Sequence, residues 1–582
     1  MMKKSEIARF LAPALLSAAM SASCTGLTQS ETAAAVTNPI DINYRFSMIK
    51  NEPPRREAAD PEIVLYKDRY YLFASKSGGY WSSPDLKSWR YIKFPEGFPT
   101  ENYAPTAEVI DGDLVFFTSG HDTFWKSSDP EGGKWERIPT KYPRRDTDPD
   151  LFRDDDGRVY IYWGCSPKDP IMGAEIDPKD GFKIIGEPVE LIGHGFKTNG
   201  WEKPGANNEE DKAGWNEGAN MIKHGGKYYL QFAAPGTQWR SYGDGYYVSD
   251  RPLGPFKYAP NSPFSIKPGG FVGSAGHGAT FRDRHGNYWH VASMLVGVRH
   301  GFERRLGLFP TFFDREGRMY SVTEMTDRPF AIPDRKMDFS RDSLSTGLVL
   351  LSFKKPVSAS SQKGALAPEN AVDEKIETWW SAETGRKGER LQIDLGRPAS
   401  VHSVHVNFAD EGFDVYGDAP APVYRYKILA SQDGKSWQTV ADKSQNSSDA
   451  PHTLVNLKRP AKARYIAIEN AADLDGGQFS LSGLRVFGKS DIPAPKQVSG
   501  LRAARGTDDR RNIEISWNPS EGAEGYVLRW GVEKDRLHNA RTLRETSVKG
   551  SFLNVGQPYF FTVEPFNAGG FGKPSQAVHV AP

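Results

Sequence analysis

Three acidic residues stand at the heads of three copies of one strand–turn–strand pattern, and this repeat limits the folds open to the chain. Asp60, Asp148 and Glu217 each precede an apolar run, a tight polar turn and an aromatic-rich run. The copies read DPEIVLYKDRYYLFAS, DPDLFRDDDGRVYIYWG and EGANMIKHGGKYYLQFAA. Repetition of a four-strand unit is typical of a β-propeller, in which the first strand of each blade lines a central channel. The three acids are therefore predicted to converge on one pocket.

Five such hairpin units follow one another between residues 45 and 335. Their runs alternate or are wholly apolar, and Gly, Asp and Asn turns separate them, as expected for short strands. Two long inserts, 178–216 and 234–276, are predicted to build a rim above the channel. The five units occupy residues 63–75, 108–119, 151–164, 220–233 and 279–293.

The rest of the chain reads as two more β domains. A length of 582 residues exceeds what one core supports. Residues 352–488 contain short strand-like runs with turn signals between them, which favours a β-sandwich. Pro493 and Pro495 mark a linker to a second set of strands over 496–582. We therefore predict an all-β chain, with a five-bladed β-propeller over 45–335 followed by two β-sandwich domains.

The charge balance excludes one class of partner. Lys and Arg number 74 against 73 Asp and Glu, so the formal net charge is +1. A chain this balanced has no electrostatic attraction for a polyanion. We predict no nucleic-acid partner.

The N-terminus predicts export. Residues 1–24 begin with Lys3 and Lys4 and continue through a short apolar stretch to small residues and Cys24, as a signal peptide does. The small residues before Cys24 resemble the lipobox of bacterial lipoproteins, although Ser21 stands where that pattern prefers an aliphatic residue. The expectation is a lipid-anchored outer-membrane lipoprotein, periplasmic or on the cell surface, or otherwise a secreted protein. Residues 25–45 form a polar leader, and Cys165 is left as a free, inert buried thiol.

The hairpin units over 45–335 resemble glycoside hydrolase family 43, whose members are five-bladed propellers that hydrolyse glycosides with inversion. The resemblance makes Asp60 the general base, Glu217 the general acid, and Asp148 the carboxylate that orients the acid and tunes its pKa. Asp146 and Asp150 lie beside Asp148, which we prefer because it precedes a proline as Asp60 does. An inverting hydrolase needs this set, because one carboxyl protonates the leaving oxygen while another activates water from the opposite face.

The same resemblance supplies candidate substrate contacts. It places His277, within a Gly-His-Gly segment, at the channel floor, and it brings one arginine of residues 303–310 to the site. Both Arg304 and Arg305 remain candidates for that arginine. Aromatic rings on or near the predicted rim either pack the core or stack on sugar, and the candidates for stacking are Trp81, Trp215, Trp239 and Tyr242, with Trp201 and Phe271 besides.

Residues 352–488 resemble the discoidin, or F5/8 type C, domain, which bacteria use as a family 32 carbohydrate-binding module. The carrying motifs include Asn-Ala-Val-Asp at 370–373 and Thr-Trp-Trp-Ser at 378–381. The resemblance implies a structural calcium held by Asn370, Asp373 and the carbonyls that follow them, whereas catalysis itself requires no cofactor. Residues 496–582 resemble a fibronectin type III domain, with a Trp on an early strand and a Tyr on a late one, and are predicted to be a spacer.

Together these features predict a monomeric, exo-acting, inverting glycosidase acting on plant polysaccharide or arabinogalactan side chains. The expected class is α-L-arabinofuranosidase or β-xylosidase. Within the same family, the Ala-Gly-His-Gly segment at 275–278 also allows a β-galactofuranosidase or galactosidase. Two other classes stay open, a surface glycan-binding protein without catalysis and a purely architectural protein.

Overall fold

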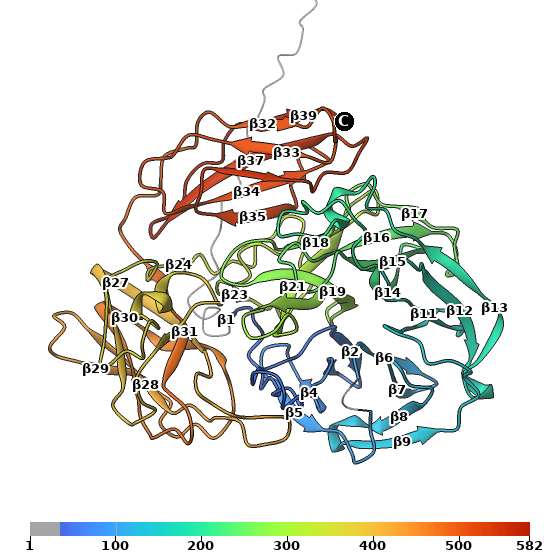
Figure 1. Cartoon of the computed structure of the whole chain (residues 1–582), viewed down its shortest axis with the longest axis horizontal. Coiled ribbons are helices and arrows are strands. Elements are labelled where there is room, and N and C mark those ends of the chain that lie inside the picture. The colour runs from blue at the N-terminus through green and yellow to red at the C-terminus, as the bar shows by residue number, and fades with distance from the viewer. Residues whose placement is uncertain (1–34, 100–101) are drawn as a thin grey trace, which may run out of the picture.

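The computed structural model describes residues 35–99 and 102–582. Figure 1 shows the sheets of the propeller arranged around a centre, with two β-sandwiches beside them. This confirms the predicted fold class, an all-β chain with a propeller followed by two sandwiches. The helical turns in the described residues are short 3-10 turns: η2 (Pro130–Gly132), η3 (Pro178–Asp180), η4 (Gly200–Glu202) and η5 (Pro368–Val372). Among these residues, no helix has the length and apolar character to span a bilayer.

The propeller has five antiparallel blades, and the fourth and fifth are joined by a parallel contact between β16 and β19. Blade 1 is β2 (Glu62–Tyr66), β3 (Arg69–Phe73), β4 (Gly79–Ser83) and β5 (Arg90–Lys93). Blade 2 is β6 (Pro105–Ile110), β7 (Asp113–Thr118), β8 (Phe124–Asp129) and β9 (Lys134–Ile138). Blade 3 is β10 (Asp150–Arg153), β11 (Val159–Trp163), β12 (Ile171–Asp177) and β13 (Lys183–Ile192). Blade 4 is β14 (Glu217–His224), β15 (Lys227–Ala234), β16 (Gly243–Ser249), β17 (Lys257–Tyr258) and β18 (Ser265–Ile266). Blade 5 is β19 (Gly273–Arg282), β20 (Tyr288–Leu295), β21 (Arg304–Phe313) and β22 (Met319–Ser321).

Local sequence explains the hairpins. The β2–β3 turn is Lys67-Asp68 and the β14–β15 turn is Gly225-Gly226, and both residues of each turn have positive φ. Two-residue hairpins with this backbone match the twist of the flanking strands. The innermost strands β2, β6, β10, β14 and β19 contact one another in sequence around the channel. The heads of these five strands therefore meet at one end of the channel.

The two ends of the propeller are tied together by a short strand pair. β1 (Ala35–Val36) pairs antiparallel with β23 (Phe330–Ala331). This pair joins the segment that enters the first blade to the segment that leaves the fifth. Packing between the blades is dominated by aromatic side chains, for example the stacked pair Phe94 and Phe98 against Trp135.

The first sandwich contains one long sheet wrapped around an apolar core. Its central strand is β27 (Arg390–Phe408), which pairs with both β30 (His452–Asn470) and β31 (Ser480–Lys489). The remaining strands are β24 (Val349–Leu350), β25 (Val357–Ala359), β26 (Trp380–Ser381), β28 (Tyr426–Ser431) and β29 (Gln438–Asp442).

The second sandwich has a three-stranded and a five-stranded sheet. The first sheet is β32 (Arg502–Arg505), β33 (Ile513–Ser516) and β36 (Ser547–Gly550). The other is β34 (Gly525–Gly531), β35 (Asn539–Leu543), β37 (Tyr559–Asn567), β38 (Gly570–Phe571) and β39 (Val578–Val580). Trp517 and Tyr559 lie in the core between the sheets.

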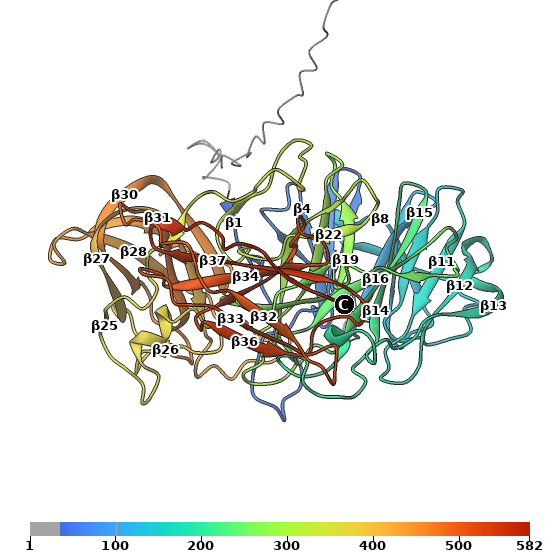
Figure 2. The same cartoon turned by 90° about the horizontal axis from the view of Figure 1, so that it is seen from above.

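Both sandwiches pack directly on the propeller, as the two views in Figures 1 and 2 show. The first is joined to the propeller by Arg56, which donates to Asp410 and Asp449, and the second by Arg511, which donates to Asp211 and the Phe196 carbonyl. Arg529 also pairs with Glu324. Residues 496–582 are predicted to be a spacer, and the structure packs this domain against the propeller through these ionic contacts.

Candidate active site

A left-handed backbone conformation recurs just before or within every innermost strand. Its φ angles are 51° at Asp60, 45° at Ala104, 51° at Asp148, 63° at Gly218 and 48° at His277. Residues other than glycine rarely adopt this conformation, although asparagine, aspartate and histidine do so more often than the rest. Because it recurs in all five blades, the propeller geometry imposes it. Three of the five residues meet at the imidazole, because His277 Nδ1 lies 3.3 Å from Asp60 Oδ1 and 3.8 Å from Asp148 Oδ2.

Hydroxyl groups from one blade fix the strand heads of the next. Ser293 accepts a hydrogen bond from the Asp60 N–H at 2.8 Å, and Ser119 does the same for Asp148 at 2.8 Å. Ser75 holds the Ala104 N–H at 2.7 Å. Each serine ends the aromatic run of its hairpin, in the segments LFAS, FFTS and HVAS. The residue of blade 3 that is equivalent in hydrogen bonding is Gly164, which directly precedes Cys165. The repeat therefore carries a signal for these residues, although they were not predicted from the sequence.

Asp60 is a buried carboxylate surrounded by donors. Oδ1 lies 3.0 Å from Arg304 Nη1 and 3.3 Å from His277 Nδ1, and Oδ2 accepts from the Ser75 hydroxyl at 2.6 Å. Burial alone would raise the pKa of Asp60, but Arg304, His277 and the two serine hydroxyls together lower it below its ordinary value. Asp60 is therefore ionised at neutral pH, as a general base requires.

Asp148, Cys165 and Glu217 form a second cluster. One ligand atom of each lies within 4.8 Å of the others, and the Cys165 thiol donates to Glu217 Oε2 at 3.1 Å. Burial, with the negative charges of Glu217 and Asp60, raises the pKa of Asp148 to about 7. Burial, with the charges of Asp148 and Glu217, also raises the pKa of the Cys165 thiol. The Cys165 thiol is free, as predicted. It contacts Glu217, so the prediction of an inert buried thiol does not fit its position.

Two further residues shape the pocket. Tyr242 is fully buried and donates its hydroxyl to Glu217 Oε1 at 2.6 Å, so it orients the acid instead of offering a ring to sugar. The backbone N–H groups of His277 and Gly278 donate to Asp244, at 2.8 and 3.0 Å. Burial would lower the pKa of His277, but the surrounding acids raise it overall, which favours the cation. Asp244 was not predicted from the sequence.

The two arginines of β21 diverge. Arg304 is buried and reaches Asp60, Glu57 and Thr237. Arg305 instead donates from Nε to His452 of the first sandwich at 2.8 Å. Successive residues of a strand face opposite sides, so one residue alone of this pair can reach the acids. Arg304 is the site arginine, and the expectation that Arg305 contacts substrate is wrong.

The predicted aromatic contacts separate into core and rim. Trp81 is fully buried, with its indole N–H donating to Asn43, so it packs the core and cannot stack on sugar; Trp201 and Phe271 are likewise buried. Trp215 is 39% exposed, and its backbone N–H donates to the Pro235 carbonyl at the start of the loop that carries the half-buried Trp239. Phe302, which was not predicted from the sequence, is 36% exposed and lies under the Arg304 guanidinium.

Two places bear on metal binding. In residues 35–99 and 102–582, Asp148, Cys165 and Glu217 are the one group of three side chains close enough to share an ion. The predicted calcium ligands Asn370 and Asp373 make hydrogen bonds within the protein. Both Asp373 carboxylate oxygens accept hydrogen bonds, from the Lys375 N–H and the Thr378 hydroxyl, and the Asn370 amide donates to the Trp379 carbonyl. Calcium takes six to eight oxygen ligands, so these two side chains alone do not make its cage.

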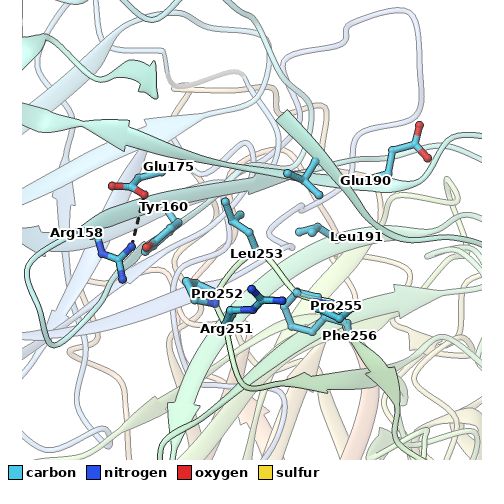
Figure 3. Close-up of a pocket in the computed structure, with 12 residues that line it drawn as sticks. Arg158, Tyr160, Glu175, Glu190, Leu191, Arg251, Pro252, Leu253, Pro255 and Phe256 are labelled. Atoms are coloured by element: carbon cyan, nitrogen blue, oxygen red, sulfur yellow. Dashed lines mark ion pairs between the residues drawn. The ribbon is translucent and has the colours of Figure 1, made fainter. Parts of the chain in front are cut away.

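A wide surface groove lies away from the acids. It measures about 650 Å³ and runs between blades 3 and 4. Figure 3 shows its lining, with Arg158 paired to Glu175 beside Tyr160 and the Pro252–Phe256 turn opposite. None of the three acids lines it. The groove is therefore separate from the acids, and the candidate active site is the buried acid cluster at the channel end.

Comparisons with known proteins match both halves of this description. Residues 54–318 match the family Glycosyl hydrolases family 43, and residues 356–482 match the F5/8 type C domain. A beta-D-galactofuranosidase of Aspergillus niger is 26% identical over 270 residues, which cover 40% of this chain and 72% of that protein. A xylan 1,3-beta-xylosidase of a Vibrio species is 25% identical over 283 residues, covering 41% of this chain and 48% of that protein. A solved structure of a glycoside hydrolase covers 78% of this chain and 100% of its own, at 20% identity and a TM-score of 0.46.

Proposed function

Because the chain carries a glycosyl hydrolases family 43 domain followed by an F5/8 type C domain, we propose that this glycoside hydrolase removes single terminal sugars by inversion, with Asp60 as base and Glu217 as acid. The observation that supports these roles is that the surroundings shift the pKa values of two neighbouring acids, Asp60 and Asp148, in opposite directions. Asp60 is held ionised by Arg304, whereas the pKa of Asp148, in contact with Glu217 through Cys165, is raised to about 7. Acids whose environments separate their pKa values mark the base and the acid sides of a site.

Each residue has one task in this mechanism. Asp60 accepts a proton from water on one face of the sugar, and Glu217 protonates the departing oxygen on the other. Asp148 keeps a proton within the acid pair, and the Tyr242 and Cys165 donors fix the two oxygens of Glu217. His277 and Arg304 hold Asp60 and offer donors to sugar hydroxyls. The exposed rings of Trp215 and Phe302 are placed to contact the part of the substrate that lies outside the buried site.

The substrate class is proposed from the family. We propose a terminal pentofuranose or xylose on plant polysaccharide or arabinogalactan side chains, the α-L-arabinofuranosidase and β-xylosidase class. A terminal β-galactofuranose or galactose is the second candidate, supported by the similarity to the Aspergillus niger enzyme, most of whose length is matched. The two candidates differ in the sugar and share the catalytic assignment.

The test is a screen of the purified protein on aryl glycosides of arabinofuranose, xylopyranose, galactofuranose and galactopyranose. Glu217→Gln is the inactive control, and Glu190→Gln, an exposed acid in the groove between blades 3 and 4, is its matched active control. Hydrolysis of one glycoside that is lost in Glu217→Gln alone supports the proposal and names the sugar. Equal hydrolysis by Glu217→Gln contradicts it. Silence on all four glycosides, together with binding of a glycan, favours a non-catalytic glycan-binding protein.

Two proposals concern the rest of the chain. Cys24 and the signal peptide lie outside the described residues, and we propose that the protein is exported and acylated at Cys24, which mass spectrometry of the membrane fraction tests. A structural calcium at Asn370 and Asp373 would require additional oxygen ligands and a local rearrangement. If the ion is bound, chelation lowers the unfolding temperature of the protein; an unchanged temperature contradicts this proposal.

A further inference from the structure

The Arg305 side chain points away from the acids, but its guanidinium donates to backbone carbonyls that lie next to them. Its Nη1 donates to two carbonyl oxygens, that of Arg56 at 3.0 Å and that of Arg304 at 2.9 Å. The first carbonyl directly precedes Glu57 and the second belongs to Arg304, the two residues whose side chains pair next to Asp60. Arg305 therefore joins the two segments that present charge to the proposed base.

The orientation of Arg305 is set by the first sandwich. His452, at the start of β30, accepts from Arg305 Nε at 2.8 Å. A guanidinium can only donate, so His452 Nε2 is the acceptor and its Nδ1 carries the hydrogen. That hydrogen is donated to Asn407 Oδ1, 2.9 Å away on β27. Both His452 and Asn407 are buried, so their geometry is fixed by the strands that carry them.

Burial and charge make His452 a dedicated acceptor. Burial, with Arg305 beside it, lowers the pKa of His452, so the ring is neutral and keeps a lone pair for Arg305. The Arg305 guanidinium lies over the ring of Tyr44, whose own hydroxyl donates to the Ile40 carbonyl. The Nη1 hydrogen bonds of the guanidinium go to backbone carbonyls. His452 is thus the side chain that fixes the direction of Arg305.

We propose that His452 is a positioning residue for the hydrolase: through Arg305 it holds Arg304 against Asp60, so the F5/8 type C domain completes the active site. This proposal rests on the hydrolase function proposed above. It assigns to the sandwich a role in catalysis that is separate from binding carbohydrate. It also explains why a buried arginine that donates to carbonyls and an imidazole stands beside the site arginine.

The test compares three variants of the full-length protein. His452→Phe keeps the ring volume but removes the acceptor, whereas His452→Gln can accept from Arg305 and donate to Asn407. Asp418→Asn is the matched control, because Asp418 bridges the same two domains but is half exposed and pairs with Arg45 and Lys93 instead of Arg305. The readout is the pH profile of kcat/KM, on whichever glycoside the screen identifies.

The expected shift has a defined sign. Asp60 faces Arg304, His277, Asp148, Glu57, Tyr103 and Tyr242. Loss of the Arg304 contact removes a cation from the ionised base, so the acidic limb of the profile moves to higher pH in His452→Phe. We expect kcat/KM to fall by about tenfold or more, since small misplacements of catalytic groups are costly. His452→Gln should stay near wild type in both respects, and Asp418→Asn should not move the limb.

Other outcomes decide against the proposal. An unmoved acidic limb in folded His452→Phe overturns it, whatever the change in stability. If His452→Phe does not fold, Arg305→Lys serves instead, because lysine keeps the charge but cannot bridge both carbonyls while contacting His452; an unmoved limb there overturns the proposal too. If the wild-type protein hydrolyses nothing, the hydrolase proposal fails separately. A crystal structure of His452→Phe then decides, since an intact Arg304–Asp60 contact contradicts the positioning role.

Discussion

Asp60 shows how a buried carboxylate can remain ionised. Its surroundings supply a guanidinium at 3.0 Å, an imidazole at 3.3 Å and a hydroxyl at 2.6 Å. Burial would favour the neutral acid, and these donors outweigh it. A few ångströms away the same burial, without comparable donors, raises the pKa of Asp148. Asp60 and Asp148 therefore differ in pKa because the cations Arg304 and His277 lie closest to Asp60.

The raised pKa of Asp148 predicts the basic limb of the pH profile. Asp148 holds its proton below about pH 7 and loses it above, which places a negative charge beside Glu217. We expect kcat/KM to decline as the pH rises through about 7, because the acid pair then lacks the proton it must deliver. Measuring kcat/KM against pH checks this. In Asp148→Asn this limb should move, and a limb unchanged in that variant would assign it to another group.

At this scale the sequence predicted the acids and His277, but not which arginine faces them or what Tyr242 contacts. Asp60, Asp148 and Glu217 were recognisable because each heads a repeated hairpin. The choice between Arg304 and Arg305 could not be made, because it depends on which face of β21 meets the acids. Tyr242 was predicted as a sugar platform, but its burial and its contact with Glu217 depend on an insert whose path no pattern encodes.

Among the elements, two innermost strands have irregular hydrogen-bond ladders at the positions where they present site residues. The β14 ladder slips between Glu217 and Asn220, and the β19 ladder slips around Gly276. Such bulges turn a strand locally and re-aim its side chains. Gly218 lies within the first slip, with φ of 63°, and a Cβ there would stand 2.8 Å from the His277 ring. The two irregular strands therefore fit together at the position of the imidazole.

Replacing Gly218 tests that fit. Gly218→Ala should displace His277, which contacts Asp60 and Asp148, and we expect turnover to fall by about a hundredfold. The left-handed backbone adds a stability loss of roughly 1–2 kcal/mol. The matched control is Gly226→Ala, where φ is 78° but a Cβ would meet nothing within 4 Å. Both variants should lose stability in thermal unfolding, and Gly218→Ala alone should lose activity; equal activity in the two would contradict the proposed fit.

For the molecule as a whole, the propeller and the first sandwich are joined by buried charge. Arg56 is fully buried and donates to Asp410 from two nitrogens and to Asp449 from a third. Burial would raise the pKa of Asp410, but Arg56 and the Tyr424 hydroxyl lower it overall. Sequence patterns predicted the three domains separately. They could not predict this joint, because a charged pair across an interface leaves no periodicity in either partner.

Removing one side of this joint should be costly. Asp410→Ala leaves Arg56 buried beside a single carboxylate, and we expect a loss of about 3–5 kcal/mol in the free energy of unfolding. The contribution of Asp410 is fully present above the unfolded carboxyl pKa of about 4 and is lost as the pH falls through the lower folded value. Denaturant unfolding at neutral and acidic pH should therefore show the difference between variant and wild type shrinking in acid. Asp418→Asn, at an exposed pair, should cost at most about 1 kcal/mol, and an equal cost in both variants would argue against the buried joint.

The division of roles between Asp60 and Glu217 is tested most directly by varying the leaving group. A dinitrophenyl glycoside departs without protonation, whereas a methyl glycoside of the same sugar needs an acid. Glu217→Gln should therefore keep much of its rate on the first substrate and lose about 10²–10⁴-fold on the second. Asp60→Asn should lose activity on both, because water must be activated in either case. If the two variants lose both substrates equally, or if Asp60→Asn is the one rescued by the better leaving group, the assignment of base and acid is wrong.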